Sequence, residues 1–256
     1  MSDWRDEGGP FSNSRVVSRA FAAIGSNLPL YFGLSLILSG IPAFLMEWWQ
    51  FGLRTEDQQQ AAAQYLSSGF WLQFLAAMAV TIMTSAILQA AITRATATHL
   101  AGSKPSLVRC LETGLRLFVP MIVIGLIVGV CVGIATIFLI VPGVILWLYW
   151  SMALPAYVQE RIGMFASFGR SAELTEGNRG NIFVIMLVLV IGMTVIDWII
   201  GRMFGAADSQ PIDALVQGLF ATFNSVVSLT IIASIYVELR NVKDGVLPNE
   251  LAEIFA

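Results

Sequence analysis

The sequence predicts an all-α membrane protein with six transmembrane helices, amphipathic interfacial helices on the cytoplasmic face, and three loosely repeated helix-hairpin units. Hydrophobic residues make up 57% of the 256 residues and charged residues 12%, against about 45–50% and about 25% in soluble domains. Several windows of about 20 residues carry no charge, which is enough for a helix to cross about 30 Å of hydrocarbon. We expect these spans to be α-helical, because a helix satisfies its backbone hydrogen bonds within its own segment.

The repeated unit is a short basic helix at the membrane surface followed by a membrane hairpin. Aligning Gly102 with Gly163 also aligns, without a gap, Ser106 with Ser167, Arg109 with Arg170 and Glu112 with Glu173. A looser third copy begins at Ser12. Residues three apart on a helix are neighbours, so Arg109–Glu112 and Arg170–Glu173 are each expected to form a local ion pair.

The elements are expected to form one membrane domain over residues 1–256. Residues 1–11 form a polar tail that lacks the basic start and apolar core of a signal peptide. Surface helices are predicted at 12–25, 106–118 and 164–180, where polar and apolar residues alternate at helical period. The spans are predicted at 28–46, 70–92, 118–140, 144–158, 182–200 and 215–239, and 240–256 form a C-terminal tail. Gly40 and Pro42 are expected to bend the first span.

The distribution of Lys and Arg predicts the orientation. With six spans, twelve of the 14 Lys and Arg residues fall on one side, and only Arg54 and Arg202 fall on the other. Because positively charged loops stay in the cytoplasm, both termini are predicted to be cytoplasmic.

Three glycines and two polar residues stand out inside the spans. Gly125, Gly129 and Gly133 are spaced four apart and are expected to let another helix approach closely, either within the bundle, which we favour, or between protomers. Asp197 is interpreted either as a proton or cation site or as a boundary residue paired with Arg202 or water. Asn224 is interpreted as an interhelical hydrogen-bonding residue or as a substrate contact.

No motif indicates catalysis. His99 is the only histidine, and no HxH, HExxH, CxxC, GxSxG, Walker or GxGxxG pattern is present. Cys110 and Cys131 are too few and too dispersed for a disulfide framework or a metal site. We therefore expect no catalytic residue, cofactor or metal, and no enzyme activity. The net charge of −3 without a basic tail argues against a nucleic-acid partner.

The arginines of the surface helices allow two interpretations. They can simply follow the positive-inside rule and hold each helix at the headgroups. They can also form a cytoplasmic ring that binds the phosphates of anionic lipids, at about 1 kcal/mol per residue near the surface. The candidate lipid-headgroup contacts are Arg15, Arg19, Arg109, Arg116, Arg170 and Arg179.

Three segments carry a family resemblance. They are VPGVILWLYWSMALPAYVQERIG at 141–163, RSAELTEGNRGNIF at 170–183 and YVELRNVKDG at 236–245. In this order they resemble the glycerophosphoryl diester phosphodiesterase membrane-domain family and related six-span bacterial proteins, over nearly the whole chain. The best-matched positions are Pro142, Gly143, Pro155, Arg170, Ser171, Leu174, Thr175, Gly177, Asn178 and Phe183. Ala172 and Glu176 depart from it, because members often carry an aromatic residue and a lysine there.

The resemblance implies a multi-pass protein of the bacterial inner (cytoplasmic) membrane. In fused relatives the phosphodiesterase chemistry belongs to a separate soluble domain with a histidine-containing metal site, of which the single His99 gives no sign. The resemblance therefore implies no catalytic mechanism for the membrane portion.

The leading hypothesis is a non-enzymatic scaffold or lipid-interacting protein linked to envelope or glycerophospholipid metabolism, with membrane phospholipid as its partner. Two alternatives stay open. A small-solute or lipid transporter would use the internal repeats and the Pro- and Gly-interrupted spans. A membrane subunit of an enzyme complex would have a protein partner in the membrane. The sequence does not set the oligomeric state.

Overall fold

The computed structural model describes residues 10–52, 68–204 and 210–245, and every regular element within these ranges is helical. Six helical stretches are long and apolar enough to cross a membrane: Leu28–Trp49, Gly69–Leu100, Leu107–Phe138, Ile140–Glu160, Arg179–Phe204 and Pro211–Asp244. Each predicted span falls on one of these six stretches. The chain is thus all-helical, with the helix lengths and composition of a multi-pass membrane protein.

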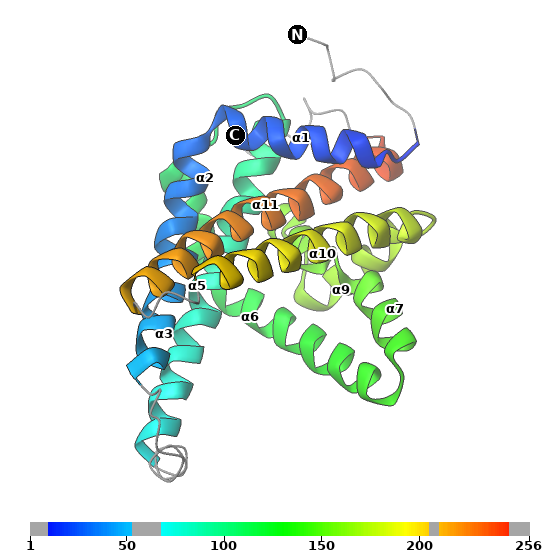
Figure 1. Cartoon of the computed structure of the whole chain (residues 1–256). Coiled ribbons are helices and arrows are strands. Elements are labelled where there is room, and N and C mark those ends of the chain that lie inside the picture. Colours follow the sequence, from blue (N-terminus) through cyan, green and yellow to red (C-terminus); the bar gives the residue numbers. More distant parts are fainter. Residues whose placement is uncertain (1–9, 53–67, 205–209, 246–256) are drawn as a thin grey trace.

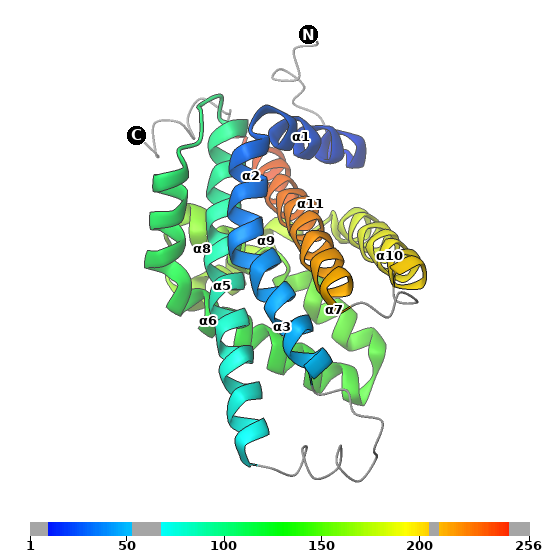
Figure 2. The same ribbon diagram turned by 60° about the vertical axis from the view of Figure 1, so that its left-hand side comes forward.

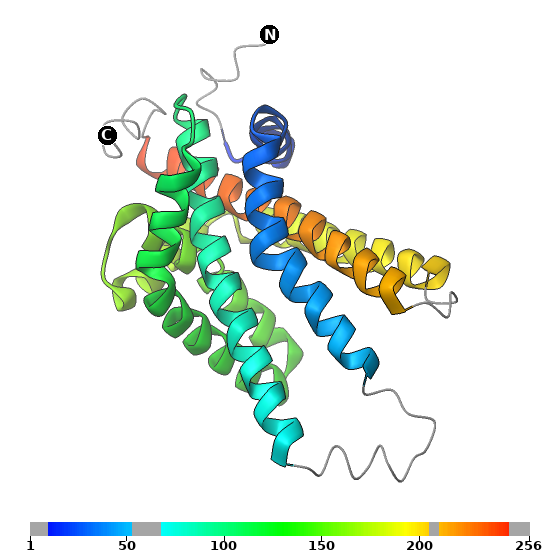
Figure 3. The same cartoon turned by 90° about the vertical axis from the view of Figure 1, so that its left-hand side faces the viewer.

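The helices are arranged around α5 and α11 (Figure 1). In chain order they are α1 Asn13–Ser26, α2 Leu28–Ser35, the π-helical segment η1 Leu36–Gly40, α3 Ile41–Gly52, α5 Ser68–Leu100, α6 Leu107–Phe138, α7 Ile140–Trp150, α8 Ala153–Glu160, α9 Met164–Thr175, α10 Arg179–Phe204 and α11 Gln210–Asp244. One end of the molecule, at the top of Figures 1 and 3, carries α1, the turn between α5 and α6, and the last turn of α11. We call it the α1 end.

The first span is distorted where Gly40 and Pro42 predicted a bend. Pro42 has no N–H for the helical hydrogen bond, and the preceding turn widens into the π-helical segment η1. There α11 comes close, because a Cβ on Gly40 would lie 2.9 Å from the carbonyl oxygen of Gly218, and a Cβ on Gly218 would lie 2.9 Å from that of Gly40. The Oγ atoms of Ser39 and Ser225 are 2.8 Å apart at the same crossing.

The predicted surface helix at 106–118 is continuous with the span that follows it. Residues 107–138 form one continuous helix, α6, whereas α9 and α10 are divided after Thr175. The division falls at Gly177, whose φ of 82° is a left-handed conformation that glycine adopts easily. In the repeat that begins at Gly102, the residue aligned with Gly177 is Arg116. A left-handed conformation is costly for an arginine, so α6 continues through this position. α6 contains Pro120 and turns away from α5 part-way along (Figure 2).

The glycine row of α6 does not pack as predicted. A Cβ on Gly125, Gly129 or Gly133 would meet nothing within 4 Å in the described part of the chain. The close approach between α5 and α6 lies about three turns earlier, where a Cβ on Gly114 would be 2.6 Å from the carbonyl oxygen of Ile87. Spacing alone predicted a close contact in α6 but at the wrong glycines, because it does not say which face of the helix its neighbour covers.

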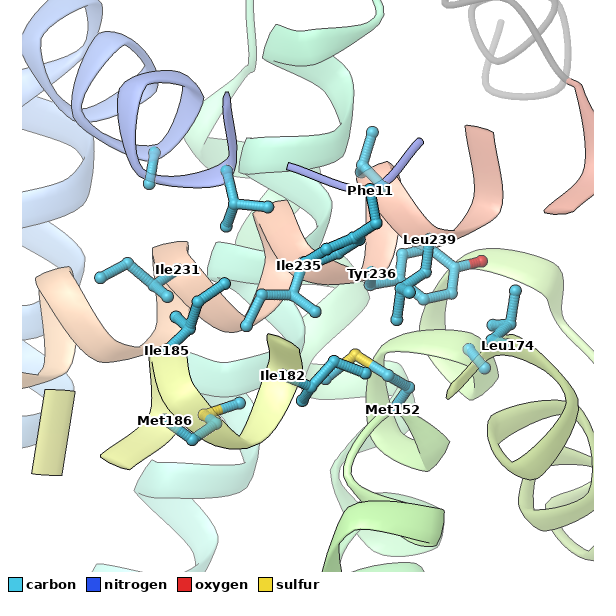
Figure 4. Close-up of a cluster of buried hydrophobic side chains, with 14 of the residues drawn as sticks. Phe11, Met152, Leu174, Ile182, Ile185, Met186, Ile231, Ile235, Tyr236 and Leu239 are labelled. Atoms are coloured by element: carbon cyan, nitrogen blue, oxygen red, sulfur yellow. The ribbon is translucent and has the colours of Figure 1, made fainter. Parts of the chain in front are cut away.

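The main buried cluster lies where α1, α8, α9 and α10 meet the second half of α11 (Figure 4). Ile235 and Leu239 of α11, Ile182 of α10, Leu174 of α9 and Met152 before α8 are all fully or nearly fully buried. This core fixes α8 and α9 against α11, and so positions the charged residues around them.

Candidate anion site and the arginine network

The six arginines predicted to form one ring separate into two groups. Arg15, Arg19, Arg170 and Arg179 are held by other parts of the protein, whereas Arg109 and Arg116 line a cavity. The first group is therefore structural, and the second is the candidate site.

Glu238 of α11 pairs with two arginines of α1. Arg15 Nε donates to Glu238 Oε1 at 2.8 Å, and Arg19 Nη1 donates to Oε2. The Glu238 side chain is 2% exposed. Burial lowers the pKa of Arg19, and the charge of Glu238 opposes that shift. The three charges tie α1 across α11.

Arg170 joins α9 to α8 and α11. Its guanidinium donates to Glu160 Oε2 at 2.9 Å, to Glu173 Oε2 at 3.1 Å and to Asp244 Oδ2. Burial lowers the pKa of Arg170, but the hydrogen bonds to Asp244 and Glu160 outweigh it and raise the pKa above its ordinary value. The hydroxyl of Tyr236 donates to Glu160 Oε1 at 2.8 Å. The predicted Arg170–Glu173 pair thus belongs to a larger network, in which the guanidinium of Arg170 contacts three acids.

Ser171, Arg179 and the other positions matched in the sequence lie on or between α7, α8, α9 and α10. Ser171 Oγ donates to the Tyr149 carbonyl at 2.7 Å and accepts from the Met152 N–H at 3.1 Å, at the break between α7 and α8. The guanidinium carbon of Arg179 lies 3.6 Å from the centroid of the Tyr149 ring, a cation–π contact. Leu174 and Thr175 are buried in α9. Pro142 and Gly143 lie at the start of α7, Pro155 in α8, Gly177 and Asn178 between α9 and α10, and Phe183 in α10.

The candidate site is a cavity of about 590 Å³ between α5, α6 and α8. Arg94 comes from α5, Arg109 and Arg116 from α6, and Arg161 follows the end of α8. Its remaining lining residues are Glu112, Thr113, Leu117, Tyr157, Val158 and Ile162. The described lining of the cavity therefore contains four arginines and one acid.

The acid of the cavity pairs with a different arginine from the one predicted. Glu112 Oε1 lies 2.6 Å from Arg116 Nη2, one turn further along α6, rather than pairing with Arg109. Both side chains are largely exposed, so this pair is weak. Within the described residues no acid pairs with Arg109 or Arg161, and their charges are available to a ligand.

Arg161 adopts a conformation that is unfavourable for its side chain. Its φ is 50° and ψ 31°, a left-handed cap at the end of α8, and no other non-glycine residue of the described ranges has a positive φ. Such a conformation costs about 1–2 kcal/mol for a residue with a Cβ. Backbone strain of this kind clusters at ligand-binding sites.

Arg94 and Arg161 were counted in the charge bias but not predicted as site residues. The repeat contains a signal that Arg109 lacks an acid partner. With Gly102 aligned on Gly163, the residue aligned with Glu160 is His99. Arg170 therefore has an acid partner on the preceding helix, and its counterpart Arg109 has none there. His99 Nδ1 instead lies 3.3 Å from Asn27 Nδ2.

The intramembrane polar candidates lie outside this cavity. Asn224 Oδ1 accepts a hydrogen bond from Ser228 Oγ of the same helix at 3.1 Å. Asp197 is exposed on α10 and does not pair with Arg202, which lies over the Trp198 ring at 5.7 Å. Among the residues that the structure describes, no three His, Cys, Asp or Glu side chains gather as a metal site would require.

No family model matches the chain, and comparison with curated proteins and with solved structures finds no significant match. The family resemblance read from the three sequence segments therefore stays a prediction. The fold defines the class, a multi-pass helical membrane protein, and the cavity is the feature from which a function can be argued.

Proposed function

We propose that this chain is a non-enzymatic membrane protein that binds the phosphate of an anionic phospholipid in the cavity formed by Arg94, Arg109, Arg116 and Arg161. The lysine and arginine bias supports an orientation in which the α1 end faces the cytoplasm. The family resemblance supports a place in a bacterial inner membrane and a scaffold role in envelope or glycerophospholipid metabolism.

The observation that carries the proposal is the charge balance of the cavity. Within the described residues, Arg109 and Arg161 line the cavity without an acid partner, whereas Glu112 pairs with Arg116. Guanidinium groups bind phosphate through paired, charge-assisted hydrogen bonds, which makes Arg the residue best suited to this ligand. Arg170 and Arg19, by contrast, are neutralised by acids of α8 and α11.

The surface next to the cavity fits the acyl chains of the same lipid. Leu115, Val119, Leu126 and Val130 of α6 are each more than half exposed and lie on one face of the helix, about one turn or two turns apart. This apolar stripe begins beside Glu112 and Arg116 and continues along the membrane-spanning part of α6. A phospholipid can therefore place its phosphate among the arginines and its chains along α6.

Thermal unfolding of delipidated protein in detergent tests the proposal. A ligand that binds the folded state raises the unfolding temperature by mass action, so a titration with anionic and with zwitterionic phospholipid gives both affinities. We expect the double variant Arg109→Gln/Arg161→Gln to weaken anionic-lipid binding about 25-fold, since each arginine contributes about 1 kcal/mol and about 1.4 kcal/mol is tenfold.

Lys104→Gln is the matched control. Lys104 is exposed on the turn between α5 and α6 and does not line the cavity, so its loss removes a positive charge close by in sequence without touching the site. The proposal fails if the wild type binds both lipids equally. It fails also if the double variant binds no more weakly than Lys104→Gln does.

A further inference from the structure

We propose that the turn between α6 and α7, residues 138–143, lies inside the hydrocarbon of the membrane as the tip of a re-entrant hairpin. α6 and α7 would then enter and leave from the α1 end, and the chain would cross the membrane four times. The occupant of the apolar surface at this tip is the acyl-chain interior of the bilayer.

This turn differs in composition from the two other connections predicted on the same side of the membrane. Residues 117–158 contain no Asp, Glu, Lys, Arg, His, Asn or Gln. The connection at 50–68 contains Arg54, Glu56 and Asp57, and the connection at 201–213 contains Arg202, Asp208 and Asp213. A loop that ends in water is expected to carry such residues, and this one carries none.

The tip presents only apolar side chains to its surroundings. Ile137, Phe138, Leu139, Ile140 and Val141 are 66–85% exposed, the longest unbroken run of large exposed apolar residues in the described ranges. Exposed to water, a contiguous apolar patch of this kind would favour association or aggregation. Hydrocarbon removes that cost.

Two backbone hydrogen bonds close the turn. Only Leu139 leaves the helical conformation, and its N–H donates to the Ala135 carbonyl at 3.0 Å. The Leu139 carbonyl accepts from the Gly143 N–H at 3.4 Å, and Pro142 brings no N–H that would need a partner.

Gly143 allows the turn to close this tightly. A Cβ at that position would lie 2.9 Å from Thr136 Cα and closer still to the Thr136 hydroxyl. That hydroxyl donates to the Val132 carbonyl at 2.8 Å within α6, so the one polar side chain near the tip is also satisfied.

In Figure 1 the α6–α7 turn lies at the lower right, apart from the end of α3 and the start of α5 at the lower left. The lysine and arginine bias is unaffected, because a re-entrant hairpin returns to the side from which it came.

Nitroxide labels in reconstituted vesicles test this inference. The parent is the full chain with Cys110→Ala and Cys131→Ala, and single cysteines are introduced as Ile140→Cys at the tip, Val188→Cys within α10 and Ile212→Cys at the start of α11. Power saturation compares collisions with oxygen, which concentrates in hydrocarbon, and with a water-soluble nickel complex. Each labelled protein must first match the unfolding temperature of its parent, and Ile137→Cys replaces Ile140→Cys if that variant does not fold.

We expect the tip label to give an oxygen-to-nickel ratio close to that of Val188→Cys and several-fold above that of Ile212→Cys. A ratio equal to that of Ile212→Cys would place the turn in water on the far side and overturn the inference. Protection of the tip label from both reagents would also overturn it, because the tip would then be covered by protein.

Discussion

Replacing Glu238 by glutamine removes the carboxylate that Arg15 and Arg19 share. The side chain of Glu238 is 2% exposed, and those of Arg15 and Arg19 are 15% and 9% exposed. The variant keeps the size of the side chain but leaves two poorly hydrated guanidinium groups facing a neutral amide. Because these contacts tie α1 to α11, the perturbation should loosen α1 as well as lower stability.

Breaking a buried ion pair by removing one partner costs about 3–5 kcal/mol. The lower limit applies here, since Arg15 also donates to the Pro10 carbonyl and both arginines retain some contact with solvent. A loss of about 3 kcal/mol in the free energy of unfolding corresponds to a fall of roughly 6–12 °C in unfolding temperature for a chain of this size.

Tryptophan fluorescence of the detergent-solubilised protein measures the unfolding temperature, and hydrogen exchange of 13–26 reports on α1. Glu112→Gln is the matched control: its pair with Arg116 is exposed and one turn apart, so about 0.5 kcal/mol or less is expected. Two results together would refute the reasoning: a Glu238→Gln protein that unfolds within 2 °C of the Glu112→Gln control, and hydrogen exchange in its α1 that is as slow as in the wild type. The 2 °C threshold corresponds to a difference of roughly 1 kcal/mol in the free energy of unfolding.

Two further substitutions test the packing around α11. Gly40→Ala would put a Cβ 2.9 Å from the carbonyl oxygen of Gly218 and should lower the free energy of unfolding by about 1–3 kcal/mol. Gly129→Ala is the control, because its Cβ enters open space and should not destabilise the protein. Equal unfolding temperatures of the two variants would contradict the close crossing of η1 and α11. Tyr236→Phe removes only the hydroxyl that donates to Glu160, and a bond to a charged group contributes about 1.5–3 kcal/mol. An unchanged unfolding temperature for that variant would show that the Glu160–Arg170 network does not depend on it.

The helical class and the six apolar stretches could be predicted because they follow from local sequence. Uncharged windows of sufficient length identify helices whatever their neighbours are. The break between α9 and α10 also has a sequence signal, since Gly177 interrupts the repeat that begins at Gly163, whereas the aligned Arg116 does not interrupt the repeat that begins at Gly102. The glycine row at 125–133 misled, because close packing depends on which face a neighbouring helix covers.

The roles of the arginines could not be read from the same local patterns. Arg15 and Arg19 meet Glu238 across more than 200 residues of sequence, and Arg170 meets Asp244 across 74. Positive charge at one membrane face predicts where these side chains lie along the membrane normal. It does not predict which of them meet an acid and which remain free to bind a ligand.

Native mass spectrometry of the protein extracted gently from its own membrane tests the central claim most directly. We predict that the wild type and Lys104→Gln retain anionic phospholipid, and that Arg109→Gln/Arg161→Gln loses it while keeping its unfolding temperature. Retention of the same lipid by the double variant would contradict the proposed site. A bare wild-type chain, or one that carries a protein partner and no lipid, would contradict the lipid-binding function and favour a transporter or a subunit of an enzyme complex.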